Sequence, residues 1–492
     1  MNVQTVIKNA RVVTPAGIVD GGVGIDGGKI VALARDQYLP DAQEVHDAGG
    51  RYLLPGLVDP HAHPGGKYPI EQDWLTESPG AAAGGVTTVG AIVRVPRMGQ
   101  PFKEFAESAD VVSWARAFPL GKELSEKNSV VDFFFTFTMN SMQHVEEIER
   151  YALECGVTTF KFHGNLKQDA TNPVSPRWAA RIGMPNTFDD SMFYVGFESI
   201  GAMRGGSGRA MVHCENTEVA PVFMKRLAAQ GVNGIKAWAR RSQDFAEAEH
   251  VRRYGYFAKV TRAPFYVLHL SSKEGLDSCR RVKDEHGETI VETCPHYLTL
   301  TAEDDYPGLL GKVNPLIRWR EDAEALWEGL RDGVIDTVGT DHVVSSIHEK
   351  LVKGDTSDHA TDPAKDIWST GSGFPGLHTM LPVMWTEGVA KGRISVSRLV
   401  EVCCTNPAKV CGLYPAKGAI EIGSDADLIV VNDTDRRRVV ARELFSSCDF
   451  SVFEGRELTG WPIMTFLRGQ VIYRNGKVTV AAGFGKYLPR TH

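Results

Sequence analysis

The segment Gly56-Leu57-Val58-Asp59-Pro60-His61-Ala62-His63-Pro64-Gly65-Gly66 is an apolar run that ends in two histidines and a Pro-Gly turn. Side chains two positions apart on a strand point to the same face, so His61 and His63 are expected to project together. Two imidazoles on one face supply half of a typical metal site. Taken alone, the pattern also fits a polar strand end with two unrelated histidines.

Residues 54–410 alternate apolar β-branched runs with helical stretches, which predicts a parallel sheet. The helical stretches include Val145–Glu154, Val219–Ala229 and Asp322–Leu330. We expect eight strands: Leu53–Asp59, Val86–Val93, Val131–Met139, Val157–His163, Ala210–Cys214, Phe265–Ser271, Ile290–Tyr297 and Thr337–Asp341. Eight strand–helix units predict an α/β fold, a TIM-like (β/α)8 barrel. The alternative is an open doubly wound sheet, which we favour less because polar residues cluster at so many strand ends.

Both ends of the chain instead show short β-like runs separated by Gly turns. Asp26-Gly27-Gly28 is a hairpin signal near the N-terminus, and Asn475-Gly476 follows a β-like run near the C-terminus. We therefore predict a small β-sandwich domain built from residues 1–53 and from residues 411–492, which include a C-terminal tail. The barrel, residues 54–410, would be inserted between its two parts.

Composition describes an ordinary globular protein. The 492 residues are 42% hydrophobic and 23% charged, with a net charge of -7 and a pI near 6.1. This balance gives no support for binding to nucleic acid or to an anionic membrane. Eight cysteines without a CxxC pair do not form a disulfide framework, and Cys155, Cys214 and Cys294 are expected to be buried as small hydrophobes. With no signal peptide or membrane span in the sequence, we expect a cytoplasmic protein.

Five of the eight expected strands carry a candidate metal ligand near the C-terminal end, where such barrels keep their chemistry. The candidates are His61, His63, Lys161, His213, His269 and Asp341. Each one alone could be a satisfied polar group of the core. Together they would hold two metal ions and leave positions open for water and substrate.

Lys161 is the unusual member, because an ammonium group in an apolar strand is costly unless it is paired or neutralised. It could form an ion pair with Asp341 or Glu215. Alternatively, its amine has reacted with carbon dioxide. The resulting carbamate would turn a buried cation into a bridging oxygen ligand.

This order of ligands resembles the binuclear amidohydrolase superfamily, and within it the cyclic-amide hydrolases: dihydropyrimidinase, hydantoinase and allantoinase. The resemblance covers nearly the whole chain. Its further motifs are Glu292–Thr301, Gly339-Thr340-Asp341-His342, Thr405–Lys409 and Gly418–Leu428.

The resemblance implies hydrolysis of a C–N amide or imide bond in a small cyclic ureide. It also implies two divalent ions per subunit, with zinc expected, an N6-carboxylysine at Lys161 and a homotetramer. One ion would be held by His61, His63, Lys161 and Asp341, and the other by Lys161, His213 and His269. Asp341 would take a proton from the attacking water and pass it to the leaving nitrogen.

The chain also departs from the family pattern. Gly65 stands where dihydroorotases have a carboxylate-binding arginine, so dihydroorotate is an unlikely substrate. Leu166 stands where hydantoinases have a tyrosine that stabilises the oxyanion. We expect His163, two residues after Lys161, either to replace that tyrosine or to support a metal ligand by a hydrogen bond. A lid residue, such as Tyr194 or Arg204, is a further option.

Candidate substrate contacts are Asn314, Ser372 and Gly65. Two alternative functions remain open from the sequence. The first is an amidohydrolase acting on an acyclic amide or carbamate, or a deaminase. The second is a non-catalytic scaffold like the dihydropyrimidinase-related neuronal proteins, which have lost metal ligands, whereas all six are present here.

Overall fold

A computed structural model describes residues 2–93, 112–164, 189–354 and 362–490. Its centre is a sheet of eight parallel strands in which each strand pairs with the next along the chain. The strands are β6 (Leu57–Ala62), β7 (Val86–Val93), β8 (Asp132–Thr138), β9 (Thr159–His163), β10 (Arg209–His213), β11 (Phe265–Val267), β12 (Thr289–Thr293) and β13 (Thr337–Val338). A parallel bridge between Ala62 and His342 joins the first strand to the segment after the last one. The predicted barrel is therefore confirmed, and the open sheet was the wrong alternative.

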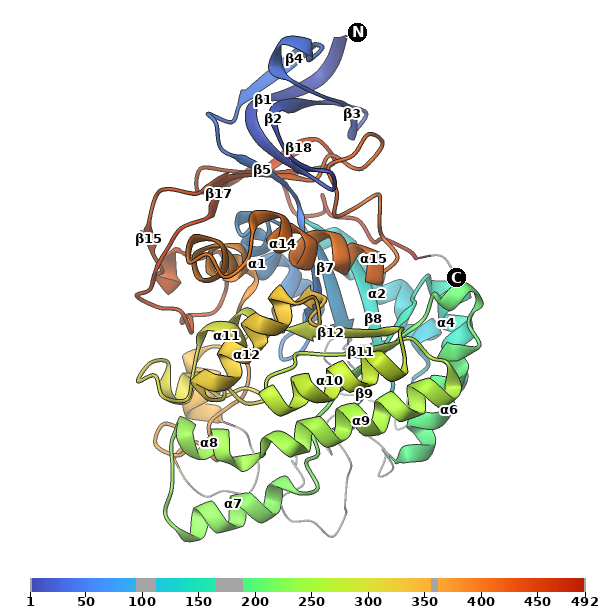
Figure 1. Ribbon diagram of the computed structural model, residues 1–492, viewed down its shortest axis with the longest axis vertical. Coiled ribbons are helices and arrows are strands. Elements are labelled where there is room, and N and C mark those ends of the chain that lie inside the picture. Colours follow the sequence, from blue (N-terminus) through green and yellow to red (C-terminus); the bar gives the residue numbers. More distant parts are fainter. Residues whose placement is uncertain (1, 94–111, 165–188, 355–361, 491–492) are drawn as a thin grey trace.

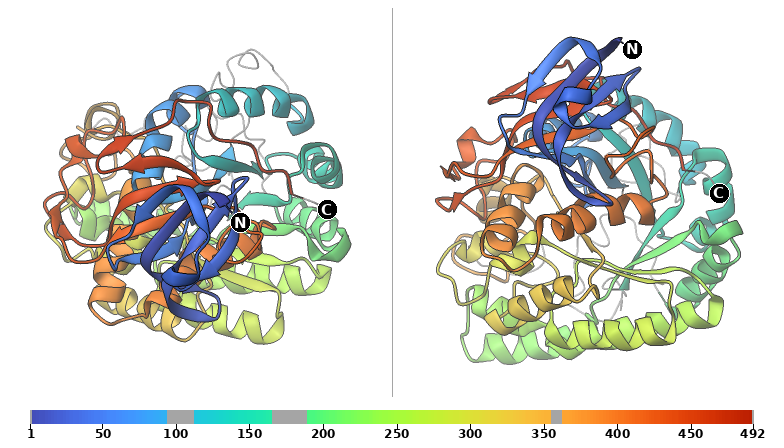
Figure 2. Two further views of the ribbon diagram at one scale, coloured as in Figure 1. Left: turned by 90° about the horizontal axis from the view of Figure 1, so that it is seen from above. Right: turned by 45° about the horizontal axis from the view of Figure 1, so that its top comes forward.

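Helices surround this barrel on the outside (Figures 1 and 2). The bounds are α1 (Ile70–Ala83), α2 (Trp114–Asn128), α3 (Met142–Glu146), α4 (Ile148–Cys155), α6 (Asp190–Gly201), α7 (Ala220–Ala229), α8 (Ile235–Arg241), α9 (Asp244–Thr261), α10 (Lys273–Glu285), α11 (Pro295–Thr299), α12 (Arg320–Arg331), α13 (Met380–Met384), α14 (Val396–Val400) and α15 (Asn406–Val410). The expected helix Val145–Glu154 is divided between α3 and α4. Apolar side chains such as Phe162, Phe193 and Phe197 fill the space between strands and helices.

Four expected strands differ from the structure by more than two residues. Two of them end early: Phe265–Ser271 ends at Val267, and Thr337–Asp341 ends at Val338. The run Leu53–Asp59 is not one strand, because the chain changes sheets at Gly56 between β5 (Tyr52–Pro55) and β6. The Gly56 N–H donates to the Asp427 carbonyl at 2.8 Å, and Asp427 directly precedes a strand of the sheet that the two chain ends form. A Cβ at this position would lie 2.1 Å from the Thr87 hydroxyl, so only glycine fits the junction.

The expected strand Ile290–Tyr297 ends early, at Thr293. Pro295 occupies the first turn of α11, where its fixed φ and missing N–H are tolerated. The apolar residues Tyr297 and Leu298 therefore belong to a buried helix rather than to the strand. Pro295 within the run was the sequence signal for this change of structure.

The two ends of the chain form a second, nine-stranded sheet (Figure 1). From the N-terminal part come β1 (Asn2–Thr14), β2 (Gly17–Asp26), β3 (Lys29–Ala34), β4 (Asp41–Asp47) and β5; from the C-terminal part come β14 (Leu428–Asn432), β17 (Trp461–Leu467), β18 (Gln470–Arg474) and β19 (Lys477–Val478). A separate two-stranded sheet pairs β15 (Arg437–Arg438) with β16 (Glu457–Leu458). The expected turns at Gly27-Gly28 and Asn475-Gly476 are confirmed, each with two residues at positive φ.

A buried ion cluster joins this sheet to the barrel. The Lys417 ammonium lies 2.7 Å from Asp132, 3.0 Å from Asp425 and 2.8 Å from Asp427. Asp132 opens β8 of the barrel, whereas Asp427 directly precedes β14 of the terminal sheet. Removing one partner from such a cluster typically costs about 3–5 kcal/mol, because the remaining charges stay buried.

The C-terminal tail packs against the N-terminal end of the barrel strands. Phe133 N–H donates to the Lys486 carbonyl at 3.0 Å, and Leu488 N–H donates to the Phe133 carbonyl at 2.8 Å. Arg490 is buried, with its guanidinium 3.0 Å from the Thr159 hydroxyl and 4.6 Å from the centre of the Phe134 ring. The tail therefore fills the base of the barrel.

All eight cysteines are unpaired thiols in buried positions, which confirms the expectation for Cys155, Cys214 and Cys294. Among the described residues, no helix combines the length and the apolarity that a bilayer crossing requires.

Candidate metal centre

Three predicted ligands meet at the junction between the first and last barrel strands. His61 lies on β6, His63 follows it directly, and Asp341 comes three residues after β13. One Asp341 carboxylate oxygen is 3.2 Å from His61 Nε2 and 2.9 Å from His63 Nε2. One ligand atom from each residue lies within 4.8 Å of the others. This is the geometry of a metal site with two nitrogen ligands and one oxygen ligand.

The remaining predicted ligands lie beside this group. The His213 and His269 ring centres are 4.4 Å apart, and the His61 and His269 ring centres are 5.2 Å apart. Lys161 pairs in register with Met211 on the neighbouring strand, two residues before His213. The structure thus brings all six predicted residues to the C-terminal end of one barrel.

The backbone at two of these residues has an unusual conformation. His269 has φ of 38° and Asp341 has φ of 49°, and both lie in the left-handed region that side chains other than glycine seldom adopt. Such conformations persist where the surroundings hold them in place. At Asp341 this support comes from Asp59, whose carboxylate accepts hydrogen bonds from the Thr340 N–H at 3.0 Å and from its hydroxyl at 2.5 Å.

The imidazoles are held in the neutral form that metal binding requires. Burial lowers the pKa of His61 well below its usual value. Burial also lowers the pKa of His213, although the nearby Glu215 carboxylate opposes this shift. Burial also lowers the pKa of His269 well below its usual value. Neutral rings and a carboxylate close together fit a divalent ion.

Lys161 is 1% exposed and shares this space with the imidazoles. A protonated amine here would repel any metal ion that the histidines hold, because Coulomb interactions are strong in a dry interior. A carbamate at the same position would carry the opposite charge and offer oxygen ligands. The environment of Lys161 therefore fits the modified side chain better than the ammonium.

Glu292 on β12 is a residue whose role our sequence interpretation missed. Its carboxylate accepts hydrogen bonds from His61 Nδ1 at 2.7 Å, from the His269 N–H at 3.2 Å and from the Tyr266 hydroxyl at 2.7 Å. The first bond turns His61 Nε2 toward Asp341. Burial raises the pKa of Glu292 to about 8. An acidic residue inside the apolar run Ile290–Thr293 was the available signal.

The expected substrate contacts Asn314 and Ser372 lie next to each other. Asn314 Nδ2 donates to the Ser372 hydroxyl at 3.5 Å, and the Asn314 side-chain oxygen accepts from Arg241 at 2.7 Å. Arg241 also lies 2.9 Å from Glu215, which is 3.2 Å from His213 Nε2. Polar contacts thus run continuously from a predicted ligand to both residues.

Neighbouring charges keep the Glu215 carboxyl group of this chain of contacts ionised. Burial alone would raise the pKa of Glu215, but Arg241 and His213 outweigh it and lower the value to about 2. Because His213 Nε2 bonds to Glu215, Nδ1 is the His213 nitrogen that remains to bind a metal ion.

Gly65 differs from the other expected contacts, since its N–H donates to Asp73 at 2.7 Å and is not available to a substrate.

His163 ends β9, in register with His213 on β10. Phe162 packs outward against α6, so the alternation of the strand turns Lys161 and His163 toward the interior. Tyr194, considered as a lid residue, lies on α6 and is 41% exposed, with its ring edge-on to Phe257. Leu166 and the side chain of Arg204 lie outside the described residues.

Comparison with known proteins agrees with this geometry. The family model described as "Amidohydrolase family" matches residues 288–472. The chain is 31% identical to the L-hydantoinase of Paenarthrobacter aurescens, over 99% of this chain and 98% of the relative. It is 30% identical to the D-hydantoinase of Ralstonia pickettii, with the same coverage.

Solved structures give the same result. The "L-Hydantoinase (Dihydropyrimidinase) from Arthrobacter aurescens" superposes with a TM-score of 0.85 at 29% identity, over 99% of this chain and 100% of that chain. The dihydropyrimidinase from Brevibacillus agri has a TM-score of 0.84 at 26% identity, over 99% and 98% of the two chains. The similarity therefore covers both the barrel and the terminal sheet.

The contacts of Glu292 generate a prediction. Glu292→Gln should weaken zinc binding about 10- to 100-fold, because an amide cannot accept from His61 and Tyr266 as a carboxylate does. Competition with a chromophoric chelator measures this affinity. Glu288→Gln, at an exposed position before the same strand, is the matched control. Equal zinc affinity in the two variants would contradict the role of Glu292.

Proposed function

Because the chain belongs to the hydantoinase and dihydropyrimidinase branch of the amidohydrolase family, we propose that it hydrolyses a ring C–N amide bond in a small cyclic ureide. Hydantoins, dihydropyrimidines and allantoin-like rings are the substrate class. The observation that carries the proposal is the convergence of four histidines, a buried lysine and an aspartate on one barrel end. Over nearly their full length, the relatives named hydantoinase align with this chain.

The proposed centre holds two divalent ions, with zinc expected. His61, His63, Asp341 and an N6-carboxylated Lys161 would hold the first ion, and Lys161, His213 and His269 would hold the second. When bound, such ions acidify water and polarise a carbonyl group. The low pKa of the buried histidines supports this assignment, since only neutral imidazole binds metal.

The residues of the chain then perform the remaining steps. Asp341 takes the proton from the attacking water and delivers it to the leaving ring nitrogen, because its carboxylate lies beside the ligands and needs no long transfer. Asn314 and Ser372 hold the ring, with Arg241 fixing the Asn314 side chain. His163 donates to the developing oxyanion in place of the family tyrosine.

We also propose that the protein is a cytoplasmic homotetramer. The family resemblance implies a homotetramer. The buried, unpaired thiols fit a reducing compartment such as the cytoplasm.

The first test is activity on a panel of hydantoins, dihydropyrimidines, allantoin, imides and N-acyl compounds. The zinc-loaded protein should open at least one cyclic ureide.

Asp341→Asn should lower kcat by several orders of magnitude while most of the metal remains, because the amide cannot accept the proton. Chromatographic detection of the ring-opened product, with metal analysis, measures both. An active Asp341→Asn enzyme would remove Asp341 from the proton transfer.

The second test concerns Lys161. Lys161→Ala should lose the metal pair and nearly all activity, because no other residue on β9 offers two bridging oxygens. A short carboxylic acid added to this variant should restore part of the turnover, whereas the same acid should leave the wild type unchanged. Intact-protein mass measurement under mild conditions should show the added carbon dioxide. An unmodified lysine in an active protein with two metals per subunit would reject the carbamate.

The third test concerns His163. Removing an oxyanion donor typically costs about 3–4 kcal/mol in the transition state. His163→Ala should therefore lower kcat by about 100- to 1000-fold, with little change in KM and with metal content unchanged. Steady-state kinetics with metal analysis separates these quantities. If kcat stays at the wild-type value, the metals or another residue stabilise the oxyanion.

A further inference from the structure

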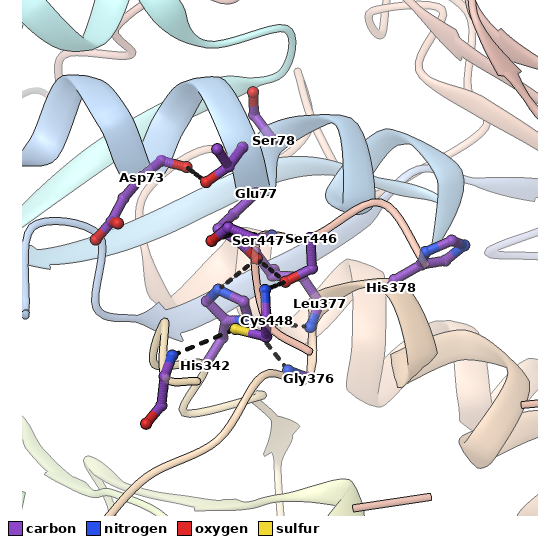
Figure 3. Close-up of polar contacts among 12 residues, drawn as sticks. Asp73, Glu77, Ser78, His342, Gly376, Leu377, His378, Ser446, Ser447 and Cys448 are labelled. Carbon is purple, nitrogen blue, oxygen red and sulfur yellow. Dashed lines mark hydrogen bonds and ion pairs between the residues drawn. The ribbon is translucent and has the colours of Figure 1, made fainter. Parts of the chain in front are cut away.

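A buried carboxylate and a buried imidazole face each other next to the predicted first metal site (Figure 3). Glu77 of α1 accepts hydrogen bonds from the Ser446 hydroxyl at 2.5 Å, from the Ser447 N–H at 2.9 Å and from the Ser447 hydroxyl at 2.8 Å. Its Oε2 atom lies 3.5 Å from His342 Nε2. These contacts fix Glu77 between two segments that are far apart in the sequence.

The orientation of His342 follows from its other nitrogen. His342 Nδ1 accepts a hydrogen bond from the Gly376 N–H at 3.0 Å, and the Leu377 N–H lies 3.5 Å away. An accepting Nδ1 places the proton of the neutral ring on Nε2. The Nε2–H group therefore lies 3.5 Å from the Glu77 carboxylate, an ion-pair distance at which the two do not form a hydrogen bond.

His342 is connected to the predicted ligands through the backbone. Its carbonyl accepts from the His63 N–H at 2.8 Å, and its parallel bridge to Ala62 closes the barrel. It also directly follows Asp341, whose φ of 49° must be held by its surroundings. Any shift of His342 would thus move both His63 and Asp341.

The space around the pair is too small for a ligand. The cavity lined by Glu77, His342, His378 and Cys448 has about 10 Å³ of room for a water-sized sphere. A single water needs ~10–15 Å³ by this measure. The contacts therefore act on the neighbouring residues and do not form a second binding site.

We propose that Glu77 and His342 form a positioning pair that holds Asp341 and His63 in register for the metal centre. Segment 446–447 anchors Glu77, the Glu77 carboxylate attracts the His342 ring electrostatically at 3.5 Å, and His342 fixes the backbone between the first and last strands. This inference rests on the proposed function, because it concerns residues that act there as ligands and as the proton acceptor.

The test uses His342→Asn and Glu77→Gln in the full-length protein. Asparagine keeps an acceptor near Nδ1 for Gly376 and removes the Nε2–H group that faces Glu77. Each variant should lower kcat on the ring substrate about 10- to 100-fold with KM within about twofold, and should weaken zinc binding about tenfold. The double variant should have a kcat and a zinc affinity no lower than those of the single variant with the larger loss, because both substitutions remove the same contact.

His378→Asn is the matched control. His378 is a buried imidazole in the same region, and its Nδ1 likewise accepts one backbone hydrogen bond, from Phe445 at 3.1 Å. It should keep wild-type kcat and zinc affinity, and all variants should melt within a few degrees of the control. Wild-type kcat and zinc affinity in His342→Asn and Glu77→Gln would overturn the inference. Equal losses in His378→Asn would overturn it too, since they would indicate general disruption.

The two proposals can fail separately. If the wild-type protein opens no ring on the panel, the proposed function fails, while chelator competition still measures zinc binding in each variant. If the wild type is active and the two variants match it in both readouts, only the positioning pair fails.

Discussion

Four imidazoles and a lysine amine share the buried end of one barrel, and much of the surrounding structure exists to keep them together without repulsion. Burial favours the neutral form of His61, His213 and His269, and the side chains of Glu292, Asp341 and Glu215 accept their ring contacts. Charges interact strongly in such a dry interior, so each carboxylate needs its own partners. Tyr266 holds Glu292 and Arg241 holds Glu215. The polar layer therefore extends outward from the ligands until it reaches the residues proposed to bind substrate.

The placement of the proposed ligands at one barrel end could be predicted from the sequence, because position relative to a strand end is a local property. His61 and His213 each end an apolar run, and alternation within the run fixes the face. Their supporting partners could not be predicted in the same way. Glu292 reaches His61 across 231 residues and Thr340 reaches Asp59 across 281 residues, so only the closed barrel brings them together. Hydropathy also could not show that Gly56 divides one apolar run between two sheets.

That division connects the terminal sheet to the proposed metal centre. Strand β5 pairs with β1 and β14, and one residue later the same chain begins the strand that carries His61. The Lys417 cluster fixes the sheet to β8, the second strand along from β6 in the barrel. A sheet with no predicted ligand of its own thus helps to set the direction from which the first pair of histidines enters the site.

The C-terminal tail has a consequence for how the protein is made. The ribosome completes all eight barrel strands before it delivers Arg490, whose guanidinium occupies the barrel base, and before it delivers β17, the partner of β14. Domains generally fold as units while synthesis proceeds at about 5–20 residues per second. A nascent chain therefore passes through a period in which the barrel lacks its base and β5 lacks its C-terminal partner β14. Exposed strand edges of this kind pair with other chains. We therefore expect chaperones to bind the nascent protein during this period.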